Sequence, residues 1–135
     1  MGDAMKKRFG FIYLALVAAT ILFQVAAIAG APLGSFTQGG VLAGELSPAG
    51  KANAAVSVLL LLVFALIVAR KAHILPAKAG SRLVDIGFWC VLVFSVLETL
   101  LNWLTPSDLE RALWGPVNTV LLVCVIGIAR LSRRK

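Results

Sequence analysis

The sequence predicts an all-α membrane protein in which four transmembrane helices form one antiparallel bundle with both termini in the cytoplasm. The chain is 60% hydrophobic and 14% charged, whereas soluble domains have about 45–50% apolar and about 25% charged residues. Its mean hydropathy is +0.95. Its apolar residues gather in four long runs, and its basic residues gather at the ends of these runs that would share one side of a membrane.

The four runs cover residues 9–29, 53–72, 83–104 and 114–131. As helices they would be about 26–33 Å long, which matches a hydrocarbon core of about 30 Å. We therefore expect a single four-helix domain over residues 1–135. The first run has an alternative interpretation as a signal peptide, because it ends in Ala-Ile-Ala at residues 27–29. It is longer than the roughly 7–15 apolar residues of a signal peptide, so we favour a retained helix; cleavage would leave three spans in the same orientation.

The net charge of +7 is distributed unequally along the chain. Only Lys51 and Arg111 lie in the first and third connections. The other basic residues precede the first run, lie between the second and third, or follow the fourth: Lys6, Lys7, Arg8, Arg70, Lys71, Lys78, Arg82, Arg130, Arg133, Arg134 and Lys135. Short segments rich in Lys and Arg stay in the cytoplasm, and the high Ala and Gly content points to a bacterial inner membrane. Because orientation accounts for the charge, we expect the lipid bilayer as a partner and no nucleic acid.

The connection before the fourth run predicts a helix start. Ser107 and Glu110 have the spacing of a capping box, and Asp108 suits a first helical turn. We expect a short helix here that lies along the membrane interface. Pro116 would then open the fourth span, where its missing N–H costs little.

The connection between the first two runs, residues 30–50, is long, rich in glycine and nearly uncharged. Long loops without structure are uncommon in compact domains. We expect the loop to fold back as a lid over the outer side of the bundle, and the alternative is an unstructured tether. The residues expected to shape the lid are Gly30, Pro32, Gly34, Gly39, Gly40 and Gly44.

The third run carries polar residues on one helical face. Ser95, Glu98, Thr99 and Asn102 fall at positions i, i+3, i+4 and i+7. Glu98 would lie about 22 Å from the inner end of its helix, in the outer third of the membrane. The other three runs place polar residues at a similar depth: Gln24, Ser57, Asn118 and Thr119. We therefore predict an outer polar pocket as a ligand or proton site formed by Glu98, Asn102, Ser95, Gln24, Asn118 and Thr119.

Among these polar residues, Glu98 has the highest free-energy cost of insertion into the membrane, since an acid at mid-membrane costs about 2.5–3.5 kcal/mol on insertion scales. Two arrangements would relieve this cost. Arg111 or Lys51 would pair with the carboxylate, or a protonated Glu98 would hydrogen-bond to the amides of the pocket. Either arrangement is compatible with a functional site and with a purely structural contact between helices.

Redox, metal and cofactor chemistry have little support in the sequence. Cys90 and Cys124 are far apart in the chain and form no Cys-x-x-Cys motif, and His73 is the only histidine. Both cysteines fall near the cytoplasmic side, where disulfides are disfavoured. We expect no cofactor and no metal site.

Two stretches of the sequence, GAPLGSFTQGGVLAGEL after the first run and LNWLTPSDLERALWGPV before the fourth, carry a family resemblance. Between Gly30 and Val117 the chain resembles a family of small bacterial four-span integral membrane proteins with no assigned activity. The matching residues are Gly30, Pro32, Gly39, Gly40, Gly44, Asn102, Ser107, Glu110, Arg111 and Pro116. The resemblance implies a four-span fold and no mechanism.

These features are compatible with three functions. The pocket and lid favour a binding or accessory protein that holds a lipid, a small amphiphile or the helix of a membrane-protein partner, with a homo-oligomer also open. The alternative is an oligomeric proton-coupled transporter that uses Glu98; small multidrug resistance transporters resemble it in length, but their acid is on the first span, where this chain has Gln24. A membrane enzyme would need Ser107, Glu110 and Arg111 as its catalytic set, and a helix cap explains these residues more simply. We therefore expect no catalytic residues.

Overall fold

A computed structural model describes residues 1–76 and 81–133. It contains four α-helices: α1 (Gly2–Ile28), α2 (Pro48–Lys71), α3 (Arg82–Leu104) and α4 (Asp108–Arg133). Two short 3₁₀ helices, η1 (Gly34–Phe36) and η2 (Gln38–Gly40), lie between α1 and α2, and no strand occurs within the described ranges. All four α-helices are long and apolar enough to cross a membrane. The prediction of an all-helical chain with four such helices is confirmed.

α2 extends beyond its apolar run because polar residues and a proline favour an earlier start. α2 begins at Pro48, five residues before its run, and the Ser47 hydroxyl caps it by accepting a hydrogen bond from the Gly50 N–H at 3.1 Å. Ser at the cap and Pro in the first turn are both favourable there, since the cap bonds one free N–H and proline lacks another. α3 alone keeps nearly the predicted bounds.

The short interfacial helix predicted before the fourth span is wrong as a separate element. A helix does start at Asp108, and the Ser107 hydroxyl caps it by accepting from the Glu110 N–H at 3.2 Å. It continues without a break through Pro116 to Arg133. Proline removes one intrahelical hydrogen bond. Next to Pro116, α4 packs closely against α3: a Cβ added at the buried Gly115 would lie 3.1 Å from the Trp103 ring.

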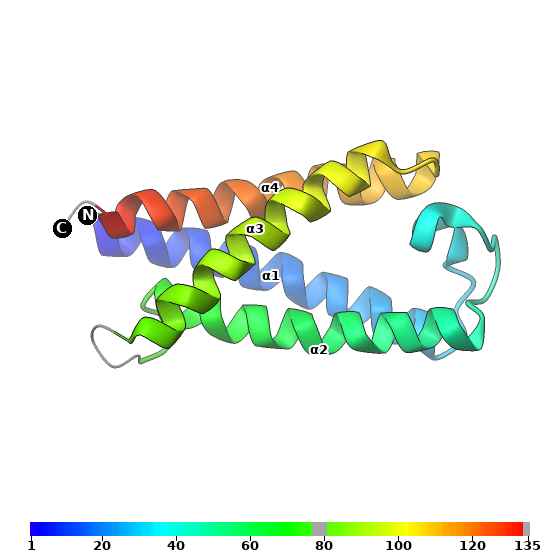
Figure 1. The fold of residues 1–135 in the computed structure, drawn as a ribbon, viewed down its shortest axis with the longest axis horizontal. Coiled ribbons are helices and arrows are strands. Elements are labelled where there is room, and N and C mark those ends of the chain that lie inside the picture. Colours follow the sequence, from blue (N-terminus) through cyan, green and yellow to red (C-terminus); the bar gives the residue numbers. More distant parts are fainter. Residues whose placement is uncertain (77–80, 134–135) are drawn as a thin grey trace.

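The two ends of the molecule differ (Figure 1). The start of α1 and the end of α4 lie at one end, here called the terminal end, and the connections at residues 29–47 and 105–107 lie at the other, the loop end. α3 crosses the bundle: it meets α2 near the terminal end, where a Cβ at Gly87 would lie 2.9 Å from Ile67, and meets α4 near the loop end through Trp103.

The main hydrophobic core belongs to the terminal half of the bundle. It draws on all four helices and consists of Tyr13, Val17, Val68, Ala72, Phe88, Val91, Leu121, Cys124, Val125 and Ile128. A smaller buried cluster of Ala27, Leu46 and Ala54 lies at the loop end. The loop half between these clusters is therefore not filled by the main core.

The outer surfaces of the helices are apolar. Large side chains on each helix are more than half exposed, among them Leu22, Leu59, Leu97 and Val123. Such a surface would be unusual in contact with water. It suggests contact with a lipid bilayer.

At the terminal end, a basic residue from the predicted cytoplasmic set is buried. The Lys6 side chain is 4% exposed, and its ammonium lies 3.2 Å from Asp3 Oδ1 and 3.4 Å from His73 Nε2. His73 itself is exposed. Three of the basic residues used in the sequence predictions, Lys78, Arg134 and Lys135, lie outside the described residues.

Candidate functional site

A cavity of about 530 Å³ lies in the loop half of the bundle. All four helices and the loop between α1 and α2 contribute to its lining. Its volume is in the range of about 300–1,000 Å³ that small-molecule sites occupy. The cavity is therefore the strongest candidate for a binding site in the described part of the chain.

Most of the predicted pocket residues line this cavity. They are Gln24 of α1, Ser95, Glu98 and Asn102 of α3, and Asn118 of α4. Ser57 of α2 joins them, so each helix supplies at least one polar side chain.

Thr119 is not among the lining residues, which corrects its assignment to the pocket. Its hydroxyl accepts from the Trp103 indole N–H at 2.9 Å and donates to the Gly115 carbonyl at 2.8 Å. One helical position after Asn118, Thr119 turns toward α3 because successive residues are about 100° apart around a helix. It joins two helices instead of facing the cavity.

Glu98 is partly buried and held by its own helix. The Asn102 amide donates to the Glu98 carbonyl oxygen at 2.8 Å and to the Glu98 carboxylate at 3.3 Å. Thr99, on the adjacent position, donates to the Asn118 carbonyl at 3.1 Å. The polar face of α3 therefore divides between the cavity and the contact with α4.

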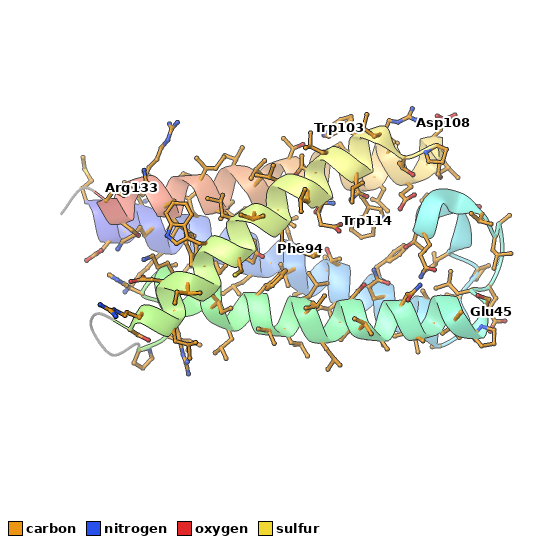
Figure 2. The ribbon with its side chains drawn as sticks, in the orientation of Figure 1. Glu45, Phe94, Trp103, Asp108, Trp114 and Arg133 are labelled. Atoms are coloured by element: carbon orange, nitrogen blue, oxygen red, sulfur yellow. The ribbon has the colours of Figure 1, made fainter. Side chains whose placement is uncertain are left out.

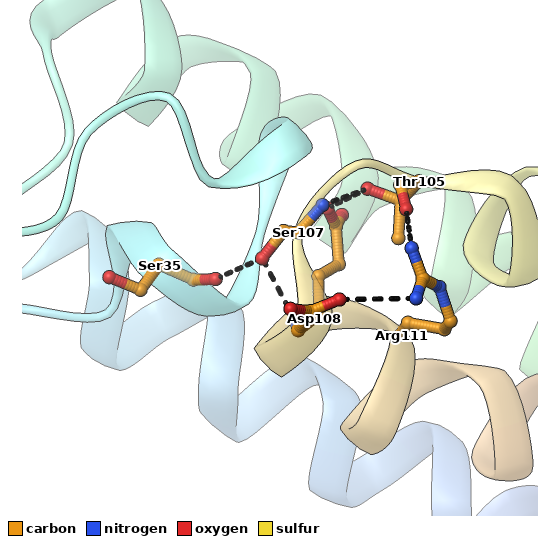
Figure 3. A network of polar contacts seen from close by, with 6 residues as sticks. Ser35, Thr105, Ser107, Asp108 and Arg111 are labelled. Atoms are coloured by element: carbon orange, nitrogen blue, oxygen red, sulfur yellow. Dashed lines mark hydrogen bonds and ion pairs between the residues drawn. The ribbon is translucent and has the colours of Figure 1, made fainter.

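Of the two alternatives for Glu98, the ion pair with Arg111 or Lys51 does not form in the structure, where both bases have other partners. The Arg111 guanidinium bonds the Asp108 carboxylate at 3.1 Å and the Thr105 carbonyl at 2.6 Å (Figure 3). Lys51 pairs with Glu45. Both bases meet acids nearer in the chain at the loop end, and no Lys or Arg among residues 1–76 and 81–133 forms an ion pair with Glu98.

Gln24 lines the cavity from α1, but its side-chain oxygen is buried. This oxygen has no hydrogen-bond partner among the described residues, although buried polar atoms in folded proteins are nearly always bonded. The Gln24 amide is therefore a polar group of the lining that the described residues leave incompletely bonded.

The loop between α1 and α2 folds back onto the start of α4. The Ser107 hydroxyl donates to the Ser35 carbonyl at 2.7 Å (Figure 3). The Trp114 indole donates to the Phe36 carbonyl at 2.7 Å. Thr37, Gln38 and Gly39 of this segment line the cavity. The lid expected from the sequence therefore corresponds to a defined structure here, joined to α4 by side-chain hydrogen bonds.

The lid glycines have different environments. Gly40 has a φ of +66°, and a Cβ there would lie 2.7 Å from the Ser107 hydroxyl oxygen. Gly34 needs its small size for another reason, since a Cβ would lie 1.8 Å from the Leu42 carbonyl oxygen. Among the six predicted lid residues only Gly39 lines the cavity; those that do not are Gly30, Pro32, Gly34, Gly40 and Gly44.

Glu110 has a role that the capping-box spacing did not predict. Its carboxylate accepts from the Gly39 N–H at 2.9 Å and from the Thr105 hydroxyl at 2.7 Å, instead of returning to Ser107. It also lines the cavity. The sequence spacing could have indicated that Glu110 faces the cavity, because Glu110, Trp114 and Asn118 fall at i, i+4 and i+8 on one face of α4.

Aromatic side chains form much of the remaining wall. Tyr13, Phe64, Phe94 and Trp114 line the cavity, and Phe64 and Phe94 meet edge to face with ring centroids 5.0 Å apart. Figure 2 shows Phe94 and Trp114 on the inner sides of α3 and α4. These residues were not predicted, because apolar residues within an apolar run carry no sign of which face they occupy.

The cysteines are separate from the site. Both are free; Cys90 is exposed and Cys124 belongs to the main core. Within the described ranges no three His, Cys, Asp or Glu side chains are grouped as metal ligands would be.

Comparisons with protein families, with curated proteins and with solved structures find no match to this chain. The class of protein therefore comes from the fold itself. Four apolar helices are consistent with a small membrane protein.

Proposed function

We propose that this chain is an integral protein of the bacterial inner membrane that binds an amphiphilic molecule in the cavity beneath its outer loop. In this proposal it is an antiparallel four-span bundle of the resembling family, with both termini in the cytoplasm and the loop end outside. One observation carries the function: a cavity with polar groups from all four helices lies under a hydrogen-bonded loop.

The proposed orientation is supported by charge. Of the basic residues in the described ranges, Lys51 and Arg111 alone lie at the loop end. All others lie in or beside the helix ends at the terminal end, as expected for the cytoplasmic side.

An amphiphile is favoured over a water-soluble ligand by the walls of the cavity. Leu60 of α2 and Leu101 of α3 line it and are 40% and 62% exposed, so this part of the lining is accessible and apolar. In the proposal the cavity opens to lipid between these helices, while residues 37–39 line it at the loop end. A molecule arriving from the bilayer would place its polar group near Glu98 and its chain toward this opening.

Native mass spectrometry of the protein released gently from its own membrane tests this proposal. We expect a defined additional mass on the wild-type protein, lost in Glu98→Gln and after deletion of residues 34–44. Asp108→Asn, which removes an exposed acid outside the cavity, should keep the additional mass. A wild-type protein that carries no additional mass, and that takes up no added amphiphile, would contradict the proposal.

A proton-coupled transporter is the second candidate, and the position of Glu98 favours it. Glu98 lines the cavity, and membrane acids of this kind often belong to ion pathways. Proton-driven uptake into proteoliposomes, abolished by Glu98→Gln, would support transport. Absence of flux together with retained amphiphile binding would leave the binding function alone.

A further inference from the structure

We infer that the cavity selects an amphiphile whose polar group is a positively charged ammonium. This inference rests on the proposed binding function and names the ligand class for the same cavity. It follows from which hydrogen-bonding atoms of the lining are already used and which are left.

The side-chain donors of the lining are mostly used within the protein. Six of them donate to backbone carbonyl oxygens: those of Thr20, Gln38, Ser57, Asn102, Asn118 and Trp114. Four of these bonds go to the carbonyl four residues earlier on the same helix. A backbone carbonyl only accepts hydrogen bonds, so the side-chain NH₂ groups of Gln38, Asn102 and Asn118 must be the donors in these bonds. Their side-chain oxygens are then free to accept.

The Glu98 carboxylate keeps unused acceptor positions. It has a single side-chain contact, the Asn102 amide at 3.3 Å, although a carboxylate has room for several donors. A ligand that donates hydrogen bonds therefore finds free positions at Glu98, and the amide oxygens of Asn102 and Asn118 belong to the same lining.

The charge of the lining has one sign. It contains two acids, Glu98 and Glu110, and no Lys, Arg or His. Glu110 already accepts two hydrogen bonds, from Gly39 and Thr105. Glu98 is the acid left for a ligand, and a cation is the ligand that compensates a partly buried carboxylate.

The aromatic walls fit the same chemistry. Phe94 neighbours Ser95 on α3, and Trp114 lies one turn before Asn118 on α4, so rings and acceptors line one space. Aromatic faces attract ammonium groups. Because no basic residue of the lining is present to meet a phosphate, an alkylammonium fits better than a phospholipid head group that carries an amine.

Separate binding titrations of four probes with the same twelve-carbon alkyl group test this inference: dodecylammonium, dodecanol, dodecanoate and dodecylphosphocholine. The protein is held in phosphatidylcholine nanodiscs, and heats are corrected with empty nanodiscs. We expect dodecylammonium to bind at least about tenfold more tightly than dodecanol, since hydrogen bonds to a charged group are worth about that factor. Dodecanoate should bind more weakly than dodecanol, and dodecylphosphocholine more weakly than dodecylammonium.

Variants then assign the preference to its residues. Glu98→Gln should bring dodecylammonium and dodecanol to within about twofold of each other, while Asp108→Asn should leave the preference unchanged. Glu98→Asp, which keeps the charge at this position, should retain the preference, and the comparison of dodecylammonium with dodecanol on the wild-type protein decides the matter if Glu98→Gln does not fold. Equal binding of ammonium and alcohol by the wild-type protein would overturn the inference and keep the binding function. If no probe binds, the proposed function fails as well.

Discussion

Glu110 should hold the loop over the cavity, and replacing it by alanine tests this. Its carboxylate accepts from the Gly39 N–H at 2.9 Å, the one bond it makes to the loop, and from the Thr105 hydroxyl beside its own helix. A hydrogen bond to a charged group contributes about 1.5–3 kcal/mol. The two other bonds between loop and helix, made by the Ser107 hydroxyl and the Trp114 indole, are neutral and contribute about 0.5–1.5 kcal/mol each.

Glu110→Ala should therefore remove about half of the free energy that holds the loop closed. A loss of about 1.5–3 kcal/mol raises the population of the lifted loop about 10- to 100-fold. The Trp114 indole proton reports this opening, because it bonds the Phe36 carbonyl of the loop and not the Glu110 side chain. Its hydrogen exchange, followed by NMR, should accelerate by the same factor.

Asp108→Asn is the matched control for this experiment. Asp108 is an acid in the same first turn of α4, and its side chain is 93% exposed and pairs with Arg111. The substitution Asp108→Asn removes the same charge from the helix N-terminus and leaves the bonds between loop and helix in place. The hydrogen-exchange rate of the Trp114 indole should therefore stay within about twofold of the wild-type rate, as for a surface change worth under 0.5 kcal/mol. Equal exchange rates in Glu110→Ala and Asp108→Asn would refute the assigned role of Glu110.

Three further predictions concern stability and orientation. Gly40→Ala should lower the free energy of unfolding by about 1–2 kcal/mol, because it forces a side chain into a left-handed backbone and against Ser107. Gly44→Ala should be neutral in the same thermal unfolding experiment, since nothing lies within 4 Å of its Cβ position; equal effects would contradict the argument. Thr99→Val should cost about 0.5–1.5 kcal/mol in unfolding from bicelles, because it removes the hydroxyl that donates to the Asn118 carbonyl across α3 and α4. Green fluorescent protein fused to either terminus should fluoresce and alkaline phosphatase should stay inactive, and a periplasmic signal from either end would reverse the proposed orientation.

Local features of the sequence predicted the helices and one of their starts. Apolar runs of membrane length predicted four helices, and the Ser107 cap predicted a helix start at Asp108. Helical spacing also placed Ser95, Glu98 and Asn102 together on the cavity side of α3. These predictions succeed because they depend on interactions between residues within about two helical turns of each other.

The tertiary structure decided the partners of the polar side chains. Glu110 matches a capping box, yet its carboxylate bonds Gly39, 71 positions away in the chain. Thr119 shares the depth of the pocket but faces Trp103 of α3. A carboxylate or hydroxyl bonds whichever donor the folded chain brings near it, and spacing along one helix carries no information on that donor.

The position of the cavity was decided in the same way. The four apolar runs look alike along their length, but the crossing of α3 from α2 toward α4 packs the terminal half and leaves space in the loop half. The sequence by itself determined that four apolar helices form and which faces of α3 are polar. The crossing of α3 and the return of the loop, both set by contacts between distant segments, decided that these faces enclose a cavity.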